Sequence, residues 1–219
     1  MRVVITGASQ GIGLETAIVF LEQGHEVFGL DILEKPERLN KYPNYVHHVC
    51  DVSVKQLMPA IEFVHILINN AGVQDERLNL AVNLIGTVNA TELYAFQPCI
   101  YSVVNVTSVS AHNGAEFPLY TASKGGVLSY TKWLAQEIAK YGATANSISP
   151  GGVITPMTQD IWEDPKKRSA VLEETLLGKW AEPREIAEWI YFISAINRSM
   201  TAQDIIIDNG ETAKYNFIQ

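Results

Sequence analysis

The chain has 219 residues, which excludes a peptide hormone or a disulfide miniprotein and fits one large α/β domain or two small ones. Hydrophobic residues make up 47% of the sequence and charged residues 18%, a composition typical of a folded chain with a substantial core. The 24 acidic and 16 basic residues give a formal net charge of −8, and a surface of this sign repels nucleic acid and anionic lipid. We therefore expect neither nucleic acid nor a membrane as a partner.

The cysteines and the first residues indicate the compartment. Cys50 and Cys99 lie in apolar segments without a paired metal-ligand spacing, which favours reduced, buried thiols. The apolar run at Met1 to Gly7 is too short for a signal peptide, and no stretch approaches the roughly 20 apolar residues of a membrane span. These features predict a cytoplasmic protein.

Short Val/Ile-rich runs alternate with segments of helical periodicity, a pattern typical of parallel strands joined by crossover helices. The strands are expected, in chain order, at 3–6, 26–31, 46–51, 64–69, 102–107, 144–149 and 204–208. The helices are expected at 12–22, 78–94, 119–140 and 184–196. The sequence therefore predicts a single doubly wound α/β domain over 1–219 with helices on both faces of the sheet. The least regular segment, 151–182, is expected to cover a site.

A glycine-rich turn joins the first predicted strand to the first helix. Glycines permit a tight turn and let backbone N–H groups approach a pyrophosphate at the positive end of a helix. The candidate cofactor-binding residues here are Gly7, Ser9, Gln10, Gly11, Ile12 and Gly13. An ordinary turn is the alternative, but the strand-loop-helix context favours a dinucleotide site.

The second predicted strand ends at Asp31, 18 residues after Gly13. An acidic side chain at this spacing accepts hydrogen bonds from the adenosine ribose hydroxyls. The 2′-phosphate of NADP adds negative charge against Asp31, and neither Gln10 nor Ile32 supplies a cation. We therefore expect NAD rather than NADP, the alternative being an Asp that only caps a turn.

Three polar residues around the middle of the chain suggest acid/base chemistry. Tyr120 and Lys124 lie four positions apart on a predicted helix and so share one face, where an ammonium lowers the pKa of a nearby phenol. Ser108 ends a predicted strand 12 residues earlier, where ligands bind in open α/β sheets. Taken singly, each residue has an ordinary structural explanation.

Taken together and in this order, the motifs resemble those of the short-chain dehydrogenase/reductase family. The resemblance spans the chain and rests on Thr6-Gly7…Gly11-Ile12-Gly13, Asn69-Asn70-Ala71-Gly72, Asn83, Ser108, Tyr120…Lys124, Pro150-Gly151 and Asp208-Asn209-Gly210. It implies that Tyr120 is the general acid/base, that Lys124 supports it and holds the nicotinamide ribose, and that Ser108 positions the substrate oxygen. It also implies that Asn83 supports, through the helix backbone, a water molecule that relays protons.

The resemblance also implies further cofactor contacts. They are Asp51 and Val52 at the adenine, Asn70, Ala71 and Gly72 beside the adenosine, and Pro150, Gly151, Val153 and Thr155 near the nicotinamide. Thr155 precedes Pro156 and has a helix cap as its alternative role. None of the five histidines has a second ligand at metal spacing, so no metal is expected.

Two intervals are short for the family: 11 positions separate Gly72 from Asn83, and 18 separate Asp51 from Asn69. We therefore expect trimmed helices on one side of the sheet. The helix at 78–94 takes part in a subunit interface in relatives, and one of the short intervals lies directly before it. The expected assembly is a homodimer or homotetramer.

The function expected from the sequence is an NAD(H)-dependent oxidoreductase that interconverts a secondary alcohol and a ketone. The alternatives are a dinucleotide-binding regulator without turnover and an epimerase or dehydratase that retains NAD. The substrate wall is expected to be mostly apolar, without an arginine clamp for a carboxylate or phosphate. Its candidate residues are Val109, His112, Phe117, Val153, Met157 and Trp162.

Overall fold

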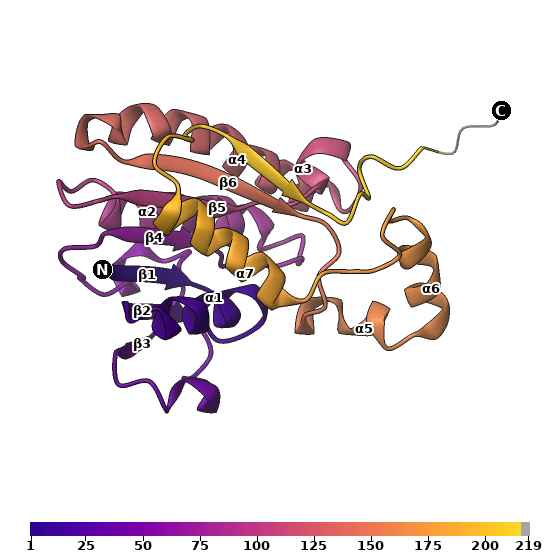
Figure 1. The fold of residues 1–219 in the computed structure, drawn as a ribbon, viewed down its shortest axis with the longest axis horizontal. Coiled ribbons are helices and arrows are strands. Elements are labelled where there is room, and N and C mark those ends of the chain that lie inside the picture. Colours follow the sequence, from indigo (N-terminus) through magenta and orange to yellow (C-terminus); the bar gives the residue numbers. More distant parts are fainter. Residues whose placement is uncertain (216–219) are drawn as a thin grey trace.

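The computed structural model describes residues 1–215, and its centre is one seven-stranded parallel sheet (Figure 1). The strands are β1 (Arg2–Thr6), β2 (Glu26–Asp31), β3 (Tyr45–Val49), β4 (Ile66–Asn69), β5 (Ser102–Val106), β6 (Thr144–Pro150) and β7 (Asp204–Ile207). Their order is β3-β2-β1-β4-β5-β6-β7, and every registered pair is parallel. All seven expected strands are present, so the predicted doubly wound fold is confirmed.

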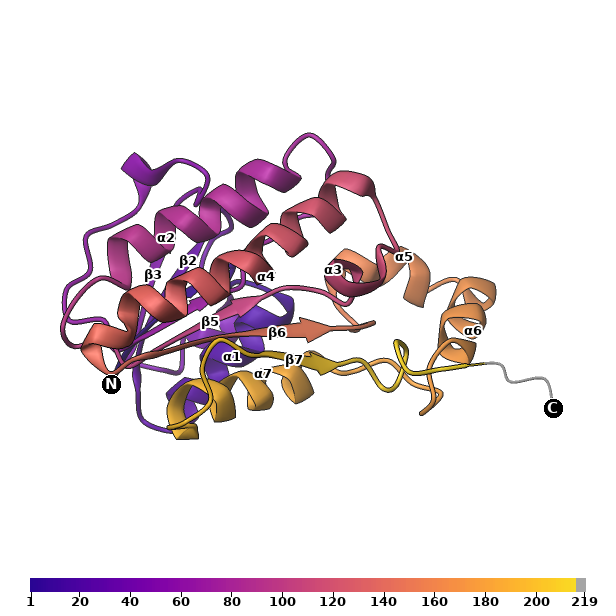
Figure 2. The ribbon, with the colours of Figure 1, turned by 90° about the horizontal axis from the view of Figure 1, so that it is seen from above.

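Helices cover both faces of the sheet (Figure 2). One face carries α1 (Gly11–Glu22) and α7 (Pro183–Tyr191), and the other carries α2 (Gly86–Tyr94) and α4 (Pro118–Ile138). Successive β1 residues alternate between these layers, because Val3 and Ile5 pack towards α1 and α7 whereas Val4 packs towards α2 and α4. Each strand therefore contributes to two hydrophobic cores, as its apolar sequence predicts.

Short helices and turns complete the described part of the chain. The remaining α-helices are α3 (Ser110–Asn113), α5 (Gln159–Trp162) and α6 (Pro165–Glu173). Two π-helical segments, Leu80–Ile85 and Phe192–Ile196, precede α2 and follow α7, and each continues the helix that was expected as one unit. Four 3₁₀ turns lie at Glu37–Leu39, Lys55–Leu57, Ala139–Tyr141 and Pro156–Thr158. No helix within residues 1–215 is long and apolar enough to cross a membrane.

The connections at the β3 side of the sheet are trimmed, as the short intervals predict. Between β3 and β4 the only helical segment is the 3₁₀ turn Lys55–Leu57. Turns and irregular chain take the place of a crossover helix there and pack Val52, Met58 and Val64 into the core against α2. Burial of these apolar side chains covers the sheet without a full helix.

A chain of buried polar side chains crosses the sheet between α2 and α4. Asn69 Nδ2 donates to Asn105 Oδ1 at 2.8 Å and to Thr91 Oγ1 at 3.2 Å, and Asn105 Nδ2 donates to Thr131 Oγ1 at 2.8 Å. All four side chains are at most 3% exposed. Buried polar groups of this kind are costly unless paired, so the network fixes the register of the helices on the sheet.

We expect Asn105→Ala to lower the free energy of unfolding by about 2–4 kcal/mol, because it leaves the partner groups on Asn69 and Thr131 without water or a replacement. The measurement is urea unfolding followed by circular dichroism. The control Asn40→Ala removes an exposed amide and should change stability by less than about 0.5 kcal/mol. A loss below about 1 kcal/mol in Asn105→Ala would contradict a stabilising role for the network.

Candidate active site

A cavity of about 1000 Å³ opens at the edge of the sheet where the strands end. It is lined by residues that follow β1 to β6 and by residues of the segment that carries α5 and α6. Figure 1 shows α5 and α6 beyond the arrowheads of the strands, on the side of this opening. The carboxyl edge of an open α/β sheet is where such folds bind ligands.

The glycine-rich turn forms one wall of the cavity. Gly7 and Gly11 have φ angles of 68° and 53°, which a residue with a Cβ adopts only at a cost. A Cβ on Gly13 would lie 1.9 Å from the Gly7 carbonyl oxygen, so only glycine lets α1 start this close to the turn. The N-cap residue Gln10 makes no side-chain capping bond. The first N–H groups of α1 therefore have no side-chain cap and suit a phosphate.

Asp31 lies at the next strand end and is held in place by the same turn. Its Oδ2 accepts from the Ser9 backbone N–H at 2.8 Å, and its Oδ1 accepts from the Leu33 N–H at 3.0 Å. Ser9, a predicted cofactor contact, does not line the cavity itself and is connected to it through Asp31. Asp51 and Val52, which the resemblance places at the adenine, line the same cavity after the end of β3.

Tyr120 and Lys124 both project from α4 into the cavity, one helical turn apart. The Lys124 Nζ donates to the Val106 carbonyl oxygen at 3.0 Å and lies 5.7 Å from the centre of the Tyr120 ring. Ser108 follows β5 and lines the same cavity. The three residues selected by the motif spacing are thus brought together by β5 and α4.

Burial is the largest influence on the pKa values of Tyr120 and Lys124. It raises the pKa of Tyr120 above its ordinary value, the negative charge of Glu116 raises it further, and a hydrogen bond with Ser108 acts in the opposite direction. Burial also lowers the pKa of Lys124 to about 8, which Glu116 opposes. The expectation that Lys124 lowers the pKa of Tyr120 is not met by these groups alone, because burial and the charge of Glu116 both raise this pKa and outweigh the hydrogen bond with Ser108.

Asn83 lies behind the cavity wall in the π-helical segment and does not line the cavity. Its Oδ1 accepts from the Val73 N–H at 2.8 Å, and its Nδ2 donates to Ser123 Oγ at 3.0 Å. Ser123 Oγ in turn donates to the Tyr120 carbonyl oxygen at 2.7 Å. Asn83 is therefore linked to the backbone of Tyr120, in a π-helical distortion of the kind common at functional sites.

The residues after β4 and those at and after the end of β6 form the rest of the expected cofactor wall. Those that line the cavity are Asn70, Ala71, Gly72, Pro150, Gly151, Val153 and Thr155. Thr155 also caps the 3₁₀ turn Pro156–Thr158, with its N–H donating to Thr158 Oγ1 at 3.1 Å. Both roles considered for Thr155 are thus compatible with its position.

The substrate wall differs from the expectation at two aromatic positions. Val109, Phe117, Val153 and Met157 line the cavity, but His112 and Trp162 do not. His112 turns away to contact Asp204 Oδ2 at 2.8 Å and Ser149 Oγ at 3.2 Å. Trp162 stacks against Trp180 at 6.0 Å, and Trp180 takes its place in the wall by packing on Gly152.

Three carboxylates in the wall were missed by the sequence analysis. Glu116 precedes α4, Glu174 follows α6, and Glu211 lies beyond β7, and all three line the cavity. Glu116 lies only two positions before α4, so its closeness in sequence to Tyr120 is the signal that could have marked it as a candidate. Glu174 and Glu211 reach the site only through the tertiary fold, so the expected apolar wall is in fact partly acidic.

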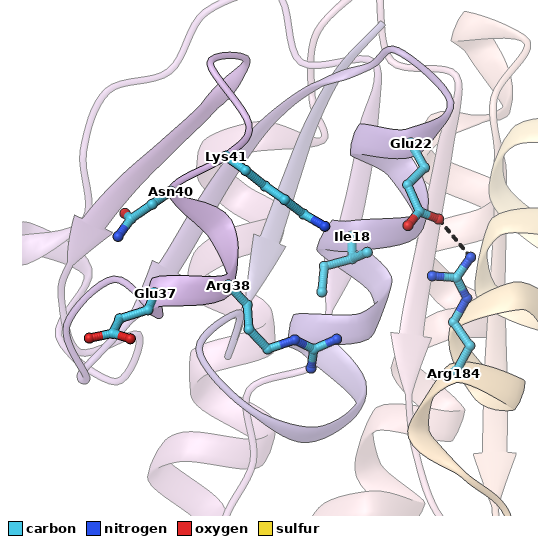
Figure 3. A pocket seen from close by; sticks show the side chains of 7 residues that line it. All are labelled: Ile18, Glu22, Glu37, Arg38, Asn40, Lys41 and Arg184. Carbon is cyan, nitrogen blue, oxygen red and sulfur yellow. Dashed lines mark hydrogen bonds and ion pairs between the residues drawn. The ribbon is translucent and has the colours of Figure 1, made fainter.

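A second hollow, of about 390 Å³, lies on the outer side of α1 (Figure 3). Figure 3 shows Arg38 and Lys41 directed towards Ile18, with Arg184 paired to Glu22 at 2.7 Å. Arg38 is also paired, to Glu15 at 2.6 Å. Because its two arginines are neutralised by neighbours and no acid/base pair faces it, this hollow does not compete with the large cavity as the active site.

Comparisons with known proteins agree with this geometry. A family model described as enoyl-(acyl carrier protein) reductase matches residues 7–212. The chain is 32% identical over 237 aligned positions to the 3-oxoacyl-[acyl-carrier-protein] reductase FabG of Thermotoga maritima, covering 94% of this chain and 96% of the relative. It is 29% identical to the cyclopentanol dehydrogenase of Comamonas testosteroni, covering 96% of each chain.

Solved structures give the same result. A 4-hydroxyisoleucine dehydrogenase mutant complexed with NADH and succinate superposes with a TM-score of 0.88 at 27% identity, covering 99% of this chain and 100% of that chain. A putative 2-deoxy-D-gluconate 3-dehydrogenase from Agrobacterium tumefaciens with bound NADP gives 0.89 at 27% identity, covering 97% and 96%. The chain belongs to the short-chain dehydrogenase/reductase family, which is a family of oxidoreductases.

Proposed function

We propose that this chain is an NAD(H)-dependent oxidoreductase that interconverts a secondary alcohol and a ketone, with Tyr120 as the general acid/base. The observation that carries the proposal is the convergence of Tyr120, Lys124 and Ser108 in one cavity with the uncapped start of α1. The named relatives are reductases and dehydrogenases, which supports this chemistry over a regulator without turnover.

The residues of the cavity account for each part of the reaction. A bound nicotinamide supplies the hydride acceptor or donor. For ketone reduction, Ser108 donates a hydrogen bond to the carbonyl oxygen and Tyr120 delivers its phenolic proton to that oxygen as it becomes the alcohol. For alcohol oxidation the same proton returns to the Tyr120 phenolate. The raised pKa keeps Tyr120 protonated near neutral pH, which is the form that reduction requires.

Lys124 and Asn83 position this group. The buried Lys124 ammonium lies beside the ring of Tyr120 and is fixed by the Val106 carbonyl. Asn83 holds Ser123 and so the first turns of α4. Both residues hold groups that must not shift by more than a fraction of an ångström for proton transfer.

We expect Tyr120→Phe to lower kcat by about 10²–10⁴-fold, because it removes the general acid that delivers the proton to the substrate oxygen. NADH formation from an alcohol panel, followed at 340 nm, measures the loss. The Kd for NADH, measured by fluorescence titration, should stay within about threefold of the wild type, since the nucleotide contacts remain. Full activity in this variant would rule out the mechanism.

The cofactor preference is proposed from the charge of the adenosine end. Asp31 is 8% exposed and faces the cavity, and Lys124 is the only lysine or arginine that lines the cavity in the described part of the chain. A 2′-phosphate therefore meets a carboxylate without a compensating cation. Relatives of known structure hold NADH in one case and NADP in another, so the choice depends on these residues of the chain itself.

We expect kcat/KM with NAD to exceed that with NADP by at least about tenfold, equivalent to about 1.4 kcal/mol. Asp31→Ser should reduce this ratio, because it removes the repulsion. The control Asp160→Ser changes an exposed carboxylate outside the cavity and should leave the ratio unchanged. Equal turnover of the two cofactors by the wild type would refute the assignment.

The segment 151–182 is proposed to cover the substrate. Ile161 and Val171, from α5 and the region of α6, line the cavity with Trp180. Thr175 and Lys214 connect this segment to the residues beyond β7, because Lys214 Nζ donates to carbonyl groups at Glu173 and Thr175. Such a cover excludes water from hydride transfer.

A homodimer or homotetramer is proposed for the assembly, with a second copy of the chain as the partner. Phe96 and Trp133 form an exposed aromatic pair by α2 and α4, with exposed fractions of 36% and 47%. Trp189 and Phe192 form another by α7, with 45% and 46%. Two exposed aromatic patches on opposite faces fit a closed assembly of identical copies.

Sedimentation equilibrium should therefore give a mass two or four times that of the chain. Trp133→Glu places a charge on the patch beside α4 and should lower the mass or weaken the assembly at least about tenfold. Lys132→Glu, at the exposed neighbouring position, is the charge control. A monomeric wild type at micromolar concentration would remove the proposal.

A further inference from the structure

We propose that the substrate of this enzyme carries a protonated amine, which Glu116 and Glu211 hold beside Tyr120. The inference rests on the proposed oxidoreductase function and specifies its substrate class. The cavity is defined as a reaction site by Tyr120 and Ser108, and the carboxylates determine which charge it accepts.

Glu116 is fixed in an unusual conformation at the entrance to α4. Its φ angle is 114°, a region that residues with a Cβ rarely adopt. Gln74 Nε2 donates to Glu116 Oε2 at 2.7 Å and so orients the carboxylate. Glu116 lies close enough to Tyr120 and Lys124 to act on the acidity of both. A strained residue held by a partner at the reactive group is typical of a functional position.

Glu211 approaches the same space from the other side of the cavity. Its Oε2 accepts from the Gly152 N–H at 3.3 Å, and a Cβ on Gly151 would come within 2.7 Å of that oxygen. Asp208 anchors the turn that presents it by accepting from the N–H groups of Gly210 and Thr212 at 2.9 Å and 2.7 Å. Glu211 is therefore part of a built turn packed against the Gly151–Gly152 wall.

The carboxylates Glu116, Glu174 and Glu211 outnumber the cations of the cavity wall. Lys124 is the only lysine or arginine in its described part, and its charge offsets only part of that of Glu116. Burial raises the pKa of both Glu116 and Glu211, and the negative charge of Glu211 adds to the effect on Glu116. A cation that enters this space relieves the repulsion, and an anion increases it.

The remaining wall favours an organic cation over a metal ion. Phe117 and Trp180 line the cavity, and aromatic faces attract ammonium groups. Within residues 1–215 no group of three His, Cys, Asp or Glu side chains is arranged to hold a metal. Glu174 adds a third carboxylate to the wall, from the segment that covers the site. An alkylammonium satisfies the carboxylates and the aromatic rings together.

The first test measures binding to the enzyme–NADH complex by titration calorimetry, with cyclohexylamine, cyclohexanol and cyclohexanecarboxylate as probes of matched size. We expect the amine to bind at least tenfold more tightly than the other two. Tighter or equal binding of the alcohol or the acid, or binding of none of the three, would overturn the proposal. This comparison uses only the wild-type protein.

Variants assign the effect to the named residues. Glu116→Gln and Glu211→Gln should each weaken amine binding at least fivefold. Glu62→Gln, at an exposed position outside the cavity, should leave it unchanged. An amine preference that persists in both cavity variants would contradict the assignment. If either variant fails to fold, as judged by circular dichroism, the wild-type comparison still decides the proposal.

Turnover separates this inference from the proposed function. The substrates are 4-aminocyclohexanol, 1,4-cyclohexanediol and 4-hydroxycyclohexanecarboxylate, with NAD reduction followed at 340 nm. The proposal expects kcat/KM for the amino alcohol to be at least tenfold above the others. Reduction of NAD with the diol or the acid as the best substrate overturns the substrate class and leaves the oxidoreductase function intact. Amine-selective binding without turnover of any alcohol would contradict the proposed oxidoreductase function and would leave the amine-binding site supported.

Discussion

The site depends on one contact, between the turns that follow β1 and β4. Thr6 Oγ1 accepts from the N–H groups of Asn70 and Ala71, both at 3.0 Å, and Asn70 Nδ2 donates to the carbonyl oxygens of Thr6 and Gly7 at 3.1 Å and 3.0 Å. These bonds join the strands where the sheet order reverses, which is where doubly wound folds bind dinucleotides. They join the glycine-rich turn to the residues after β4, and both line the cavity that Tyr120 enters from α4.

Most of the fold could be predicted from the sequence, because strands buried on both faces have continuous apolar runs and their helices have a regular period. Tyr120, Lys124 and Ser108 could also be predicted, since their spacing along one helix and one strand end determines where they lie. His112 and Glu211 could not. Whether His112 faces the cavity depends on Asp204, which is far away in sequence, and Glu211 reaches the wall only because Asp208 closes a turn beyond β7.

The trimmed β3–β4 connection is an example of a change that the framework tolerates. Met58 and Val64 provide apolar surface that a helix supplies in longer chains, and the polar network of Asn69 and Asn105 keeps α2 and α4 in register. Packing and hydrogen bonding thus replace secondary structure in this connection. Its first residues, Asp51 and Val52, still line the cavity, so the shortening leaves that part of the wall in place.

Acidity and substrate charge are coupled through one residue. Glu116 raises the pKa of Tyr120 and, in the proposal above, also holds the substrate ammonium. A cation bound at Glu116 offsets the negative charge that raises the pKa of Tyr120. The pKa of the phenol is therefore lower with such a substrate bound than without it. The same carboxylate would then select the substrate and adjust the proton donor to it, and a neutral substrate would lack this adjustment even if it fitted the cavity.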